Sequence, residues 1–148
     1  MKFKILGGNG SIYSDAFSKN LNEPKGHISM PYHGNIEKQT MNNPNYRDTL
    51  FTGKHSQLIV MSLKPHEQIG NEVHPHVDQF FRIEGGTAHF VIDNGKEKYT
   101  IGPGGAVIVP SGHWHNVIAG DKTVKLYTIY SPSNHPPNTK QKVRPKND

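Results

Sequence analysis

The chain has 148 residues with 15 glycines, 11 prolines and no cysteine, which predicts one domain built from many short strands. The absence of cysteine excludes disulfides and thiolate metal sites. The formal net charge is +5 at pH 7, but four basic residues against one acid between Lys140 and Asp148 supply +3 of it, so a nucleic-acid partner is not expected.

Residues 1–35 have little hydrophobic periodicity, so we expect an irregular N-terminal arm. Met1–Leu6 can form a short strand, because apolar residues alternate with lysines there. Gly7–Ser11 is expected to be a flexible turn, since it lacks the lysine and the helix of a phosphate-binding loop. No apolar run approaches the roughly 18 residues of a membrane span, and residues 1–20 lack a secretory hydrophobic core. We therefore expect a soluble, cytoplasmic protein without membrane contact.

The middle of the chain alternates short apolar runs with turn residues. The run Ser56–Leu63 is apolar enough for a strand buried on both faces. Asn94 and Gly95 lie between two alternating runs, which is a strong hairpin signal. The predicted strands are Leu50–Phe51, Ser56–Leu63, Gln79–Ile83, Thr87–Ile92, Lys96–Ile101, Ala106–Val109, His113–Ala119 and Thr123–Tyr130. Such closely spaced strands predict an all-β fold, an antiparallel β-barrel or a jelly roll.

This strand-rich domain is expected to span residues 36–137, with residues 36–47 leading into it. Repeated prolines beyond Ser131 are expected to end regular sheet structure, because proline cannot donate a hydrogen bond to a neighbouring strand. Residues 138–148 are then a short basic tail, expected to be solvated.

Histidines and acids gather in two segments of the domain. In the first, Glu72, His74 and His76 recur at a spacing of two, which puts alternate side chains on one face of an extended strand. In the second, His113 and His115 follow a Pro-Ser-Gly turn with the same spacing. These potential metal ligands can converge on one point.

At these residues the chain resembles the cupin superfamily. The second cupin motif has a glycine, five residues, Pro-x-Gly, two residues and a histidine, and it is complete here as Gly104, Pro110, Gly112 and His115. One departure is that the asparagine that the family has after three further residues is replaced by Ala119. The resemblance covers residues 36–137 and implies a double-stranded β-helix, the jelly roll of cupins.

The first cupin motif departs more from the family pattern. Counting back from Gly86 places Gln79 on the glutamate of the family and Glu72 and His74 on its histidine pair. The resemblance thus implies a ligand set of Glu72, His74, Gln79 and His115, with His76 and Asp78 as alternates. A rival alignment pairs His74 with His76 but puts a phenylalanine on the glutamate position. The residues around His74 also resemble a branch of small cupins described as mannose-6-phosphate isomerase-like.

Nitrogen and oxygen donors without sulfur suit one divalent transition metal, such as Zn, Fe, Mn or Ni. Gln79 in place of a glutamate lowers the negative charge of the site by one unit, which favours an anionic substrate as an additional ligand. The other interpretation of Gln79 is a hydrogen bond that orients a ligand histidine, and that of Glu72 is a surface charge.

Four other residues in or near the two cupin motifs can also be interpreted. His76 is expected at an exposed corner or beside a ligand, and His113 is expected to point away from the metal or to lie at the rim of the barrel. Trp114 is expected to pack in the core on the opposite face from the histidines. Arg82 forms an ion pair with an acid such as Glu84, or anchors a substrate carboxylate or phosphate.

Three functions fit these patterns. The first is a small metal-dependent enzyme, an isomerase-like Lewis acid or a dioxygenase, that acts on a polar small molecule in the barrel. The second is a non-catalytic module that binds a small ligand, and the third is a scaffold without metal. We also expect a homodimer, since dimers are common among small cupins and cover exposed edge strands.

Overall fold

The computed structural model describes residues 30–147. The strand expected at Met1–Leu6 and the turn at Gly7–Ser11 therefore lie outside the described residues. Within residues 30–147, no helix combines the length and the apolar character needed to cross a membrane.

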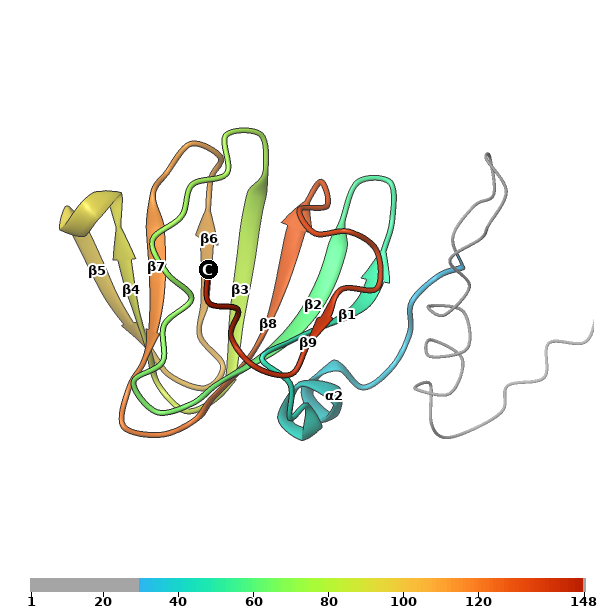
Figure 1. Cartoon of the computed structure of the whole chain (residues 1–148), viewed down its shortest axis with the longest axis horizontal. Coiled ribbons are helices and arrows are strands. Elements are labelled where there is room, and N and C mark those ends of the chain that lie inside the picture. Colours follow the sequence, from blue (N-terminus) through green and yellow to red (C-terminus); the bar gives the residue numbers. More distant parts are fainter. Residues whose placement is uncertain (1–29, 148) are drawn as a thin grey trace, which may run out of the picture.

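The described residues form two antiparallel sheets (Figure 1). The larger sheet has the order β6-β3-β8-β2-β1-β9, and the smaller has the order β5-β4-β7. The strands are β1 Arg47–Thr52, β2 Gln57–Leu63, β3 Asp78–Gly85, β4 Ala88–Ile92, β5 Glu97–Ile101, β6 Ala106–Val109, β7 His115–Ala119, β8 Val124–Ser131 and β9 Lys140–Gln141. The predicted all-β, jelly-roll class is confirmed, although over residues 30–147 the two sheets are not joined into a closed barrel.

The core lies between the two sheets. Phe81 on β3 packs edge-on against Phe90 on β4, with ring centroids 5.2 Å apart. Both side chains are fully buried, together with inward-facing residues of β2, β7 and β8. This packing follows from the alternation in the sequence, because every second residue of β3 and β7 points into the same layer.

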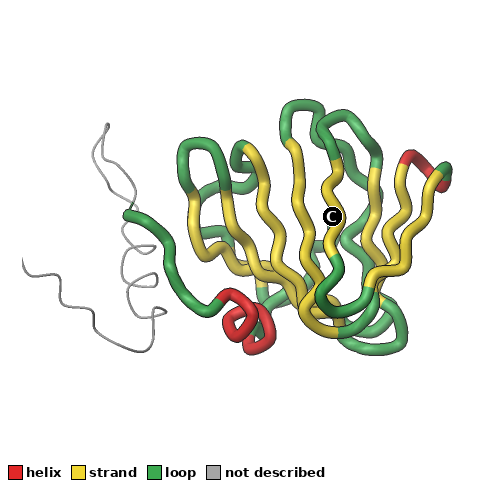
Figure 2. The backbone as a smooth tube through the Cα atoms, turned by 180° about the vertical axis from the view of Figure 1, so that it is seen from behind, coloured by secondary structure: helices red, strands yellow, loops and turns green. Residues whose placement is uncertain are grey.

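The predicted strands agree with the observed ones to within a few residues. β4 and β5 form the expected hairpin, which turns through a short 3-10 helix η1, Asp93–Gly95, with Asn94 in the left-handed region at φ 57. Figure 2 shows from behind that the strands run side by side, with loops gathered at their two ends.

The helix α2, Ile36–Asn42, was not predicted from the sequence. Its N-cap is Asn35, whose side chain accepts a hydrogen bond from the Lys38 N–H at 2.9 Å. Thr40 is buried, and the helix packs at one end of the larger sheet (Figure 1). At seven residues the helix is too short to show a convincing apolar period. The capping residue Asn35 was the feature of the sequence that could have indicated it.

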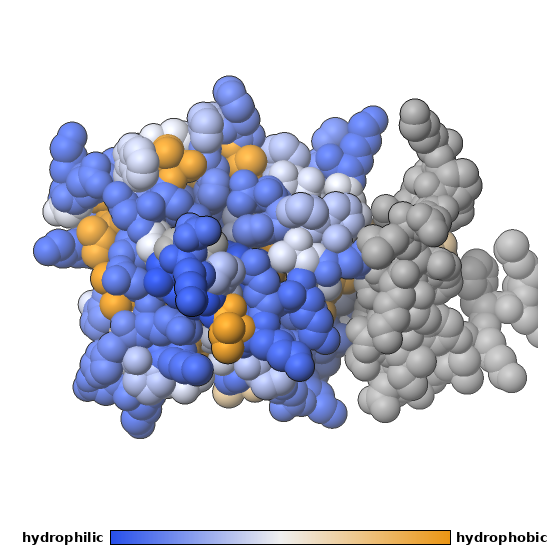
Figure 3. Space-filling model, in the orientation of Figure 1, coloured by the Kyte–Doolittle hydropathy of each residue, from blue (hydrophilic) through white to orange (hydrophobic). Residues whose placement is uncertain are grey.

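The segment after Ser131 differs from the prediction that its prolines end sheet structure. β9 pairs with β1, with Lys140 opposite Asp48. Further on, the Arg144 side chain donates a hydrogen bond to the Ile69 carbonyl at 3.2 Å. The segment thus bridges from the larger sheet to the chain that runs beside β7. On the face in Figure 3 the surface is mostly hydrophilic, with separate small hydrophobic patches.

Candidate metal centre

Glu72 lies directly opposite His115. The Glu72 N–H donates to the His115 carbonyl and the His115 N–H donates to the Glu72 carbonyl, both at 2.9 Å. This reciprocal pair forms an isolated antiparallel bridge between β7 and the segment that precedes β3. The sequence predicted a regular strand through Glu72, His74 and His76. The structure has only this bridge, yet the bridge is enough to place Glu72 beside His115.

A turn at residues 110–112 brings His74 to the same place. The Gly112 N–H donates to the His74 carbonyl at 2.9 Å, and Gly112 has a φ of +86, a conformation that favours glycine. Asp78 secures the other side of the turn by accepting the Ser111 N–H at 2.9 Å. Asp78, predicted as an alternate ligand, therefore has a structural partner outside the cluster.

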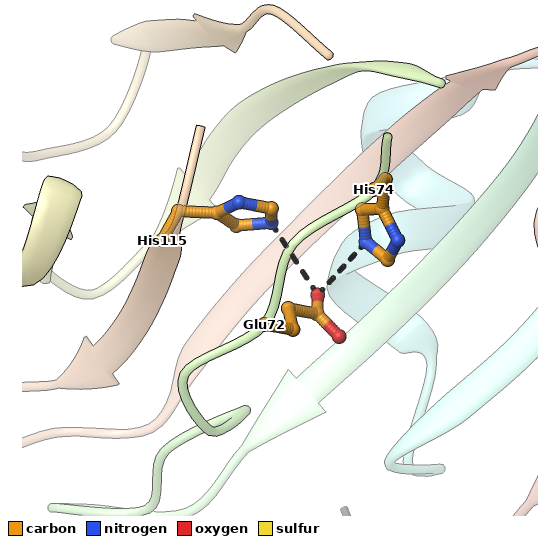
Figure 4. Close-up of side chains that lie close together, drawn as sticks. All are labelled: Glu72, His74 and His115. Atoms are coloured by element: carbon orange, nitrogen blue, oxygen red, sulfur yellow. Dashed lines mark ion pairs between the residues drawn. The ribbon is translucent and has the colours of Figure 1, made fainter. Parts of the chain in front are cut away.

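Three side chains converge where these segments meet (Figure 4). Oε1 of Glu72 lies 3.3 Å from Nε2 of His74 and 3.4 Å from Nε2 of His115. The potential ligand atoms of Glu72, His74 and His115 all lie within 4.8 Å of one another. Among the described residues, this is the one group of three or more histidines and acids with such a geometry. We call it the Glu72 cluster.

The hydrogen bonds of His115 determine which of its nitrogens faces the cluster. Nδ1 lies 3.0 Å from the His113 carbonyl oxygen. A carbonyl can only accept, so Nδ1 carries the hydrogen and Nε2 of the neutral ring presents a lone pair to the cluster. The side chain of His115 is 2% exposed, so the ring is held rigidly inside the fold.

His74 presents an unsatisfied nitrogen to the same point. Its Nε2 is buried and has no partner with hydrogen-bond geometry, although Oε1 of Glu72 is 3.3 Å away. A buried polar atom without a partner is unfavourable, typically by about 1–3 kcal/mol. A cation between His74 and Glu72 would remove that penalty, so the donor set fits a metal ion.

Gln79 lies beside His115 at the start of β3. Its Oε1 is 3.1 Å from Nε2 of His115, and its Nε2 donates to Oγ1 of Thr128 at 2.9 Å. The residue is 1% exposed. This position agrees with both sequence interpretations of Gln79, a ligand or a group that orients His115.

The charge of Glu72 depends on its two histidine neighbours. Burial raises the pKa of this carboxyl, but the imidazoles of His115 and His74, 3.4 and 3.3 Å from Oε1, outweigh burial and lower it to about 2. The cluster therefore needs a positive charge beside Glu72, which either protons on the imidazoles or a metal ion can supply.

Aromatic residues form the walls around the two histidine rings. Tyr130 lies edge-on to His74 with centroids 5.8 Å apart, and Phe81 lies edge-on to His115 at 6.0 Å. Burial and the negative charge of Glu72 raise the pKa of Tyr130, so its phenol stays protonated. The Tyr130 hydroxyl also lies 3.3 Å from Nε2 of His135.

The remaining residues singled out in the sequence lie apart from the Glu72 cluster. His76 is exposed. Nδ1 of His113 lies 2.8 Å from Oδ2 of Asp93. Arg82 forms an ion pair with Glu84, with Nε 2.9 Å from Oε1.

The prediction that Trp114 packs in the core is wrong, because Trp114 is 43% exposed. Only His115 and later residues of this segment belong to β7, so strand alternation does not govern the position of Trp114.

Sequence reasoning missed Thr128, Tyr130 and His135. Tyr130 and Thr128 reach the site because β8 pairs with β3, with Tyr130 opposite Gln79. Their alternation along β8 was visible in the sequence, but the register between β8 and β3 was not.

Comparison with known proteins supports the cupin resemblance. A family profile described as a cupin domain matches residues 59–130, which contain all four residues of the predicted ligand set. A crystal structure of a Bacillus halodurans protein has 38% identity and a TM-score of 0.76, and the match covers 80% of this chain and 93% of that one. A Klebsiella pneumoniae protein described as having a double-stranded β-helix domain has 18% identity and a TM-score of 0.60, covering 77% and 100% of the two chains, which shows the fold alone.

Two relatives known from their sequences are uncharacterized proteins. One, from Acanthamoeba polyphaga mimivirus, is 45% identical over 106 residues, which make up 70% of this chain and 66% of that protein. The other, YrkC of Bacillus subtilis, is 45% identical over 113 residues, or 72% of this chain and 60% of that protein. The matches thus span less than two thirds of either relative.

Proposed function

The chain belongs to the cupin superfamily, and from this we propose that Glu72, His74, Gln79 and His115 hold one divalent transition metal with which the protein acts on a polar small molecule. The observation that carries the proposal is the convergence of acceptor atoms. Oε1 of Glu72 and Nε2 of both histidines point to one place, and Nε2 of His74 lacks a hydrogen-bond partner there.

The donor types narrow the choice of ion. Two imidazole nitrogens, one carboxylate and one amide oxygen are donors that zinc, iron, manganese and nickel accept. A metal held this way, with coordination positions left open, can polarise a substrate carbonyl or bind O2 if it is ferrous iron. The protein would therefore be an isomerase-like Lewis acid or an oxygenase.

Residues of the chain would hold the metal ligands in place and shield the ion from water. The His113 carbonyl fixes the His115 ring through Nδ1, and the bridge to His115 fixes the backbone of Glu72. Phe81 and Tyr130 exclude water from the inner side of the cluster, while the Glu72 side chain is 31% exposed and leaves a way in from solvent. A small molecule would enter past Glu72.

A non-catalytic ligand-binding module is the second candidate. It is favoured by the groups that touch the two histidine rings from outside the cluster, namely Phe81, Tyr130 and Gln79. None of the three is a base at neutral pH, so a proton-transfer reaction would have to use Glu72 or the substrate itself.

Metal titration of the purified protein tests the proposal. Wild type, free of affinity tag and chelator, is loaded anaerobically with Fe(II), Mn(II), Ni(II) or Zn(II) and measured by elemental analysis and calorimetry. We expect near-stoichiometric uptake of one ion, lost in the double variant His74→Ala, His115→Ala. His76→Ala, which removes an exposed histidine next to the cluster, is the matched control and keeps the uptake. Absence of uptake by wild type would refute the proposal.

A further inference from the structure

The Thr128 hydroxyl favours one of the two orientations of the Gln79 amide. Oγ1 of Thr128 donates its single hydrogen to the Phe80 carbonyl at 2.9 Å, so it can only accept from Gln79. With the amide turned over, Thr128 could donate to Oε1 of Gln79 only by giving up its hydrogen bond to the Phe80 carbonyl. Thr128 therefore directs the amide oxygen of Gln79 toward the Glu72 cluster.

This orientation gives the cluster a neutral oxygen where a second carboxylate would fit. Glu72 is the only acid in the cluster, as defined over the described residues. A divalent ion beside one carboxylate and one neutral amide would leave a net charge of +1.

A buried excess of positive charge favours an anionic ligand, because low dielectric strengthens the attraction. Such a ligand would approach from the Glu72 side, since the Glu72 side chain is 31% exposed whereas that of His115 is 2% exposed.

Resting on the metal site proposed above, we propose that the Glu72 cluster binds a small anion with oxygen donors, such as a carboxylate, and that the neutral amide of Gln79 is the group that sets this preference. Replacing Gln79 by glutamate makes the loaded site neutral. The anion then loses its electrostatic advantage, whereas a neutral ligand does not.

The test compares wild type with Gln79→Glu, both loaded with Co(II), whose visible absorption reports on added ligands. Acetate is the anionic probe and imidazole is the neutral probe. We expect acetate to bind Gln79→Glu at least about tenfold more weakly than wild type, with imidazole unchanged. Gln68→Glu, which makes the same change of charge at an exposed residue outside the Glu72 cluster, is the matched control and should retain the acetate affinity of wild type.

The outcomes separate the two proposals. If wild type takes up no Co(II), the metal site itself is refuted before any anion is added. If Co(II) binds but acetate affinity is equal in wild type and Gln79→Glu, or imidazole weakens as much as acetate, the anion preference alone is overturned. Should Gln79→Glu fail to fold, Glu72→Gln supplies the opposite change, and acetate must then bind about tenfold more tightly at saturating Co(II).

Discussion

The two ends of the space between the sheets differ in chemistry although the same strands run through both. Inward-facing residues of β3 change from Gln79 to Phe81 and Ile83, and those of β7 change from His115 to Val117 and Ala119. β8 shows the same change from Thr128 to Leu126 and Val124. Burial is nearly complete at both ends.

The difference indicates which end of this space stabilises the fold. At the apolar end, buried surface alone stabilises the sheets, by about 25 cal/mol per Å². At the polar end, buried groups must be paired, and Nε2 of His74 is not. The apolar end therefore carries the fold, and the Glu72 cluster at the other end is the part that can be changed without losing it.

The largest effect is expected from Phe90→Ala at the apolar end. Phe90 is fully buried against Phe81, so its removal leaves a cavity and lowers the free energy of unfolding by about 3–5 kcal/mol. Urea unfolding of the metal-free protein measures this. A loss of unfolding free energy below about 1 kcal/mol would contradict the conclusion that the apolar end supplies most of the stability.

The next effect is expected from His115→Ala in the cluster. Metal affinity should fall at least about a hundredfold, because one of two imidazole donors is lost. The unfolding free energy of the metal-free protein should change much less than in Phe90→Ala, since His115 contributes polar contacts and less apolar packing than Phe90. Calorimetric titration gives the metal affinity, and urea unfolding of the same preparation gives the free energy of unfolding. Equal losses of stability in His115→Ala and Phe90→Ala would contradict the comparison.

A smaller effect is expected from Thr128→Val, which keeps the shape and removes the hydroxyl. The Gln79 amide is then free to turn its nitrogen toward His115, and metal affinity should fall by about tenfold to a hundredfold. Thr128→Ser, which retains the hydroxyl, should bind metal within about threefold of wild type. If serine and valine behave alike, the hydroxyl does not hold the amide.

The smallest effect is expected at acid pH. The folded-state pKa of Glu72 is lowered from 4.5 to about 2, so its contribution to stability is present above about pH 4.5 and is lost as the pH falls toward 2. Glu72→Gln lacks this contribution, and the stability of its metal-free form should therefore decline less steeply over that range. Thermal unfolding at intervals between pH 5 and pH 2 compares the slopes, and parallel curves would contradict the pairing of Glu72 with the two histidines.

The sequence predicted the strands well because their signal is local. Apolar alternation and turn residues such as Asn94 and Gly95 lie within a few positions of each strand. The spacing of the second cupin motif singled out His115, and counting back from Gly86 brought in Glu72, His74 and Gln79. The structure places these four side chains together, and their role as metal ligands stays a prediction.

The structural features that the sequence did not predict depend mostly on contacts between distant segments. β9 forms only because residues 140–141 reach the edge of β1. Thr128 and Tyr130 are recognisable as neighbours of the site only when the register of β8 on β3 is known. The position of Trp114 was mistaken because strand alternation was extended into the irregular segment before β7.

The most direct test of the central claim is anomalous diffraction from crystals of the protein loaded with one equivalent of Zn(II) or Ni(II). We predict one strong peak bounded by Glu72, His74 and His115, with the amide oxygen of Gln79 facing it. A stoichiometrically loaded protein whose peak lies elsewhere, for example beside the exposed histidines, would contradict the account.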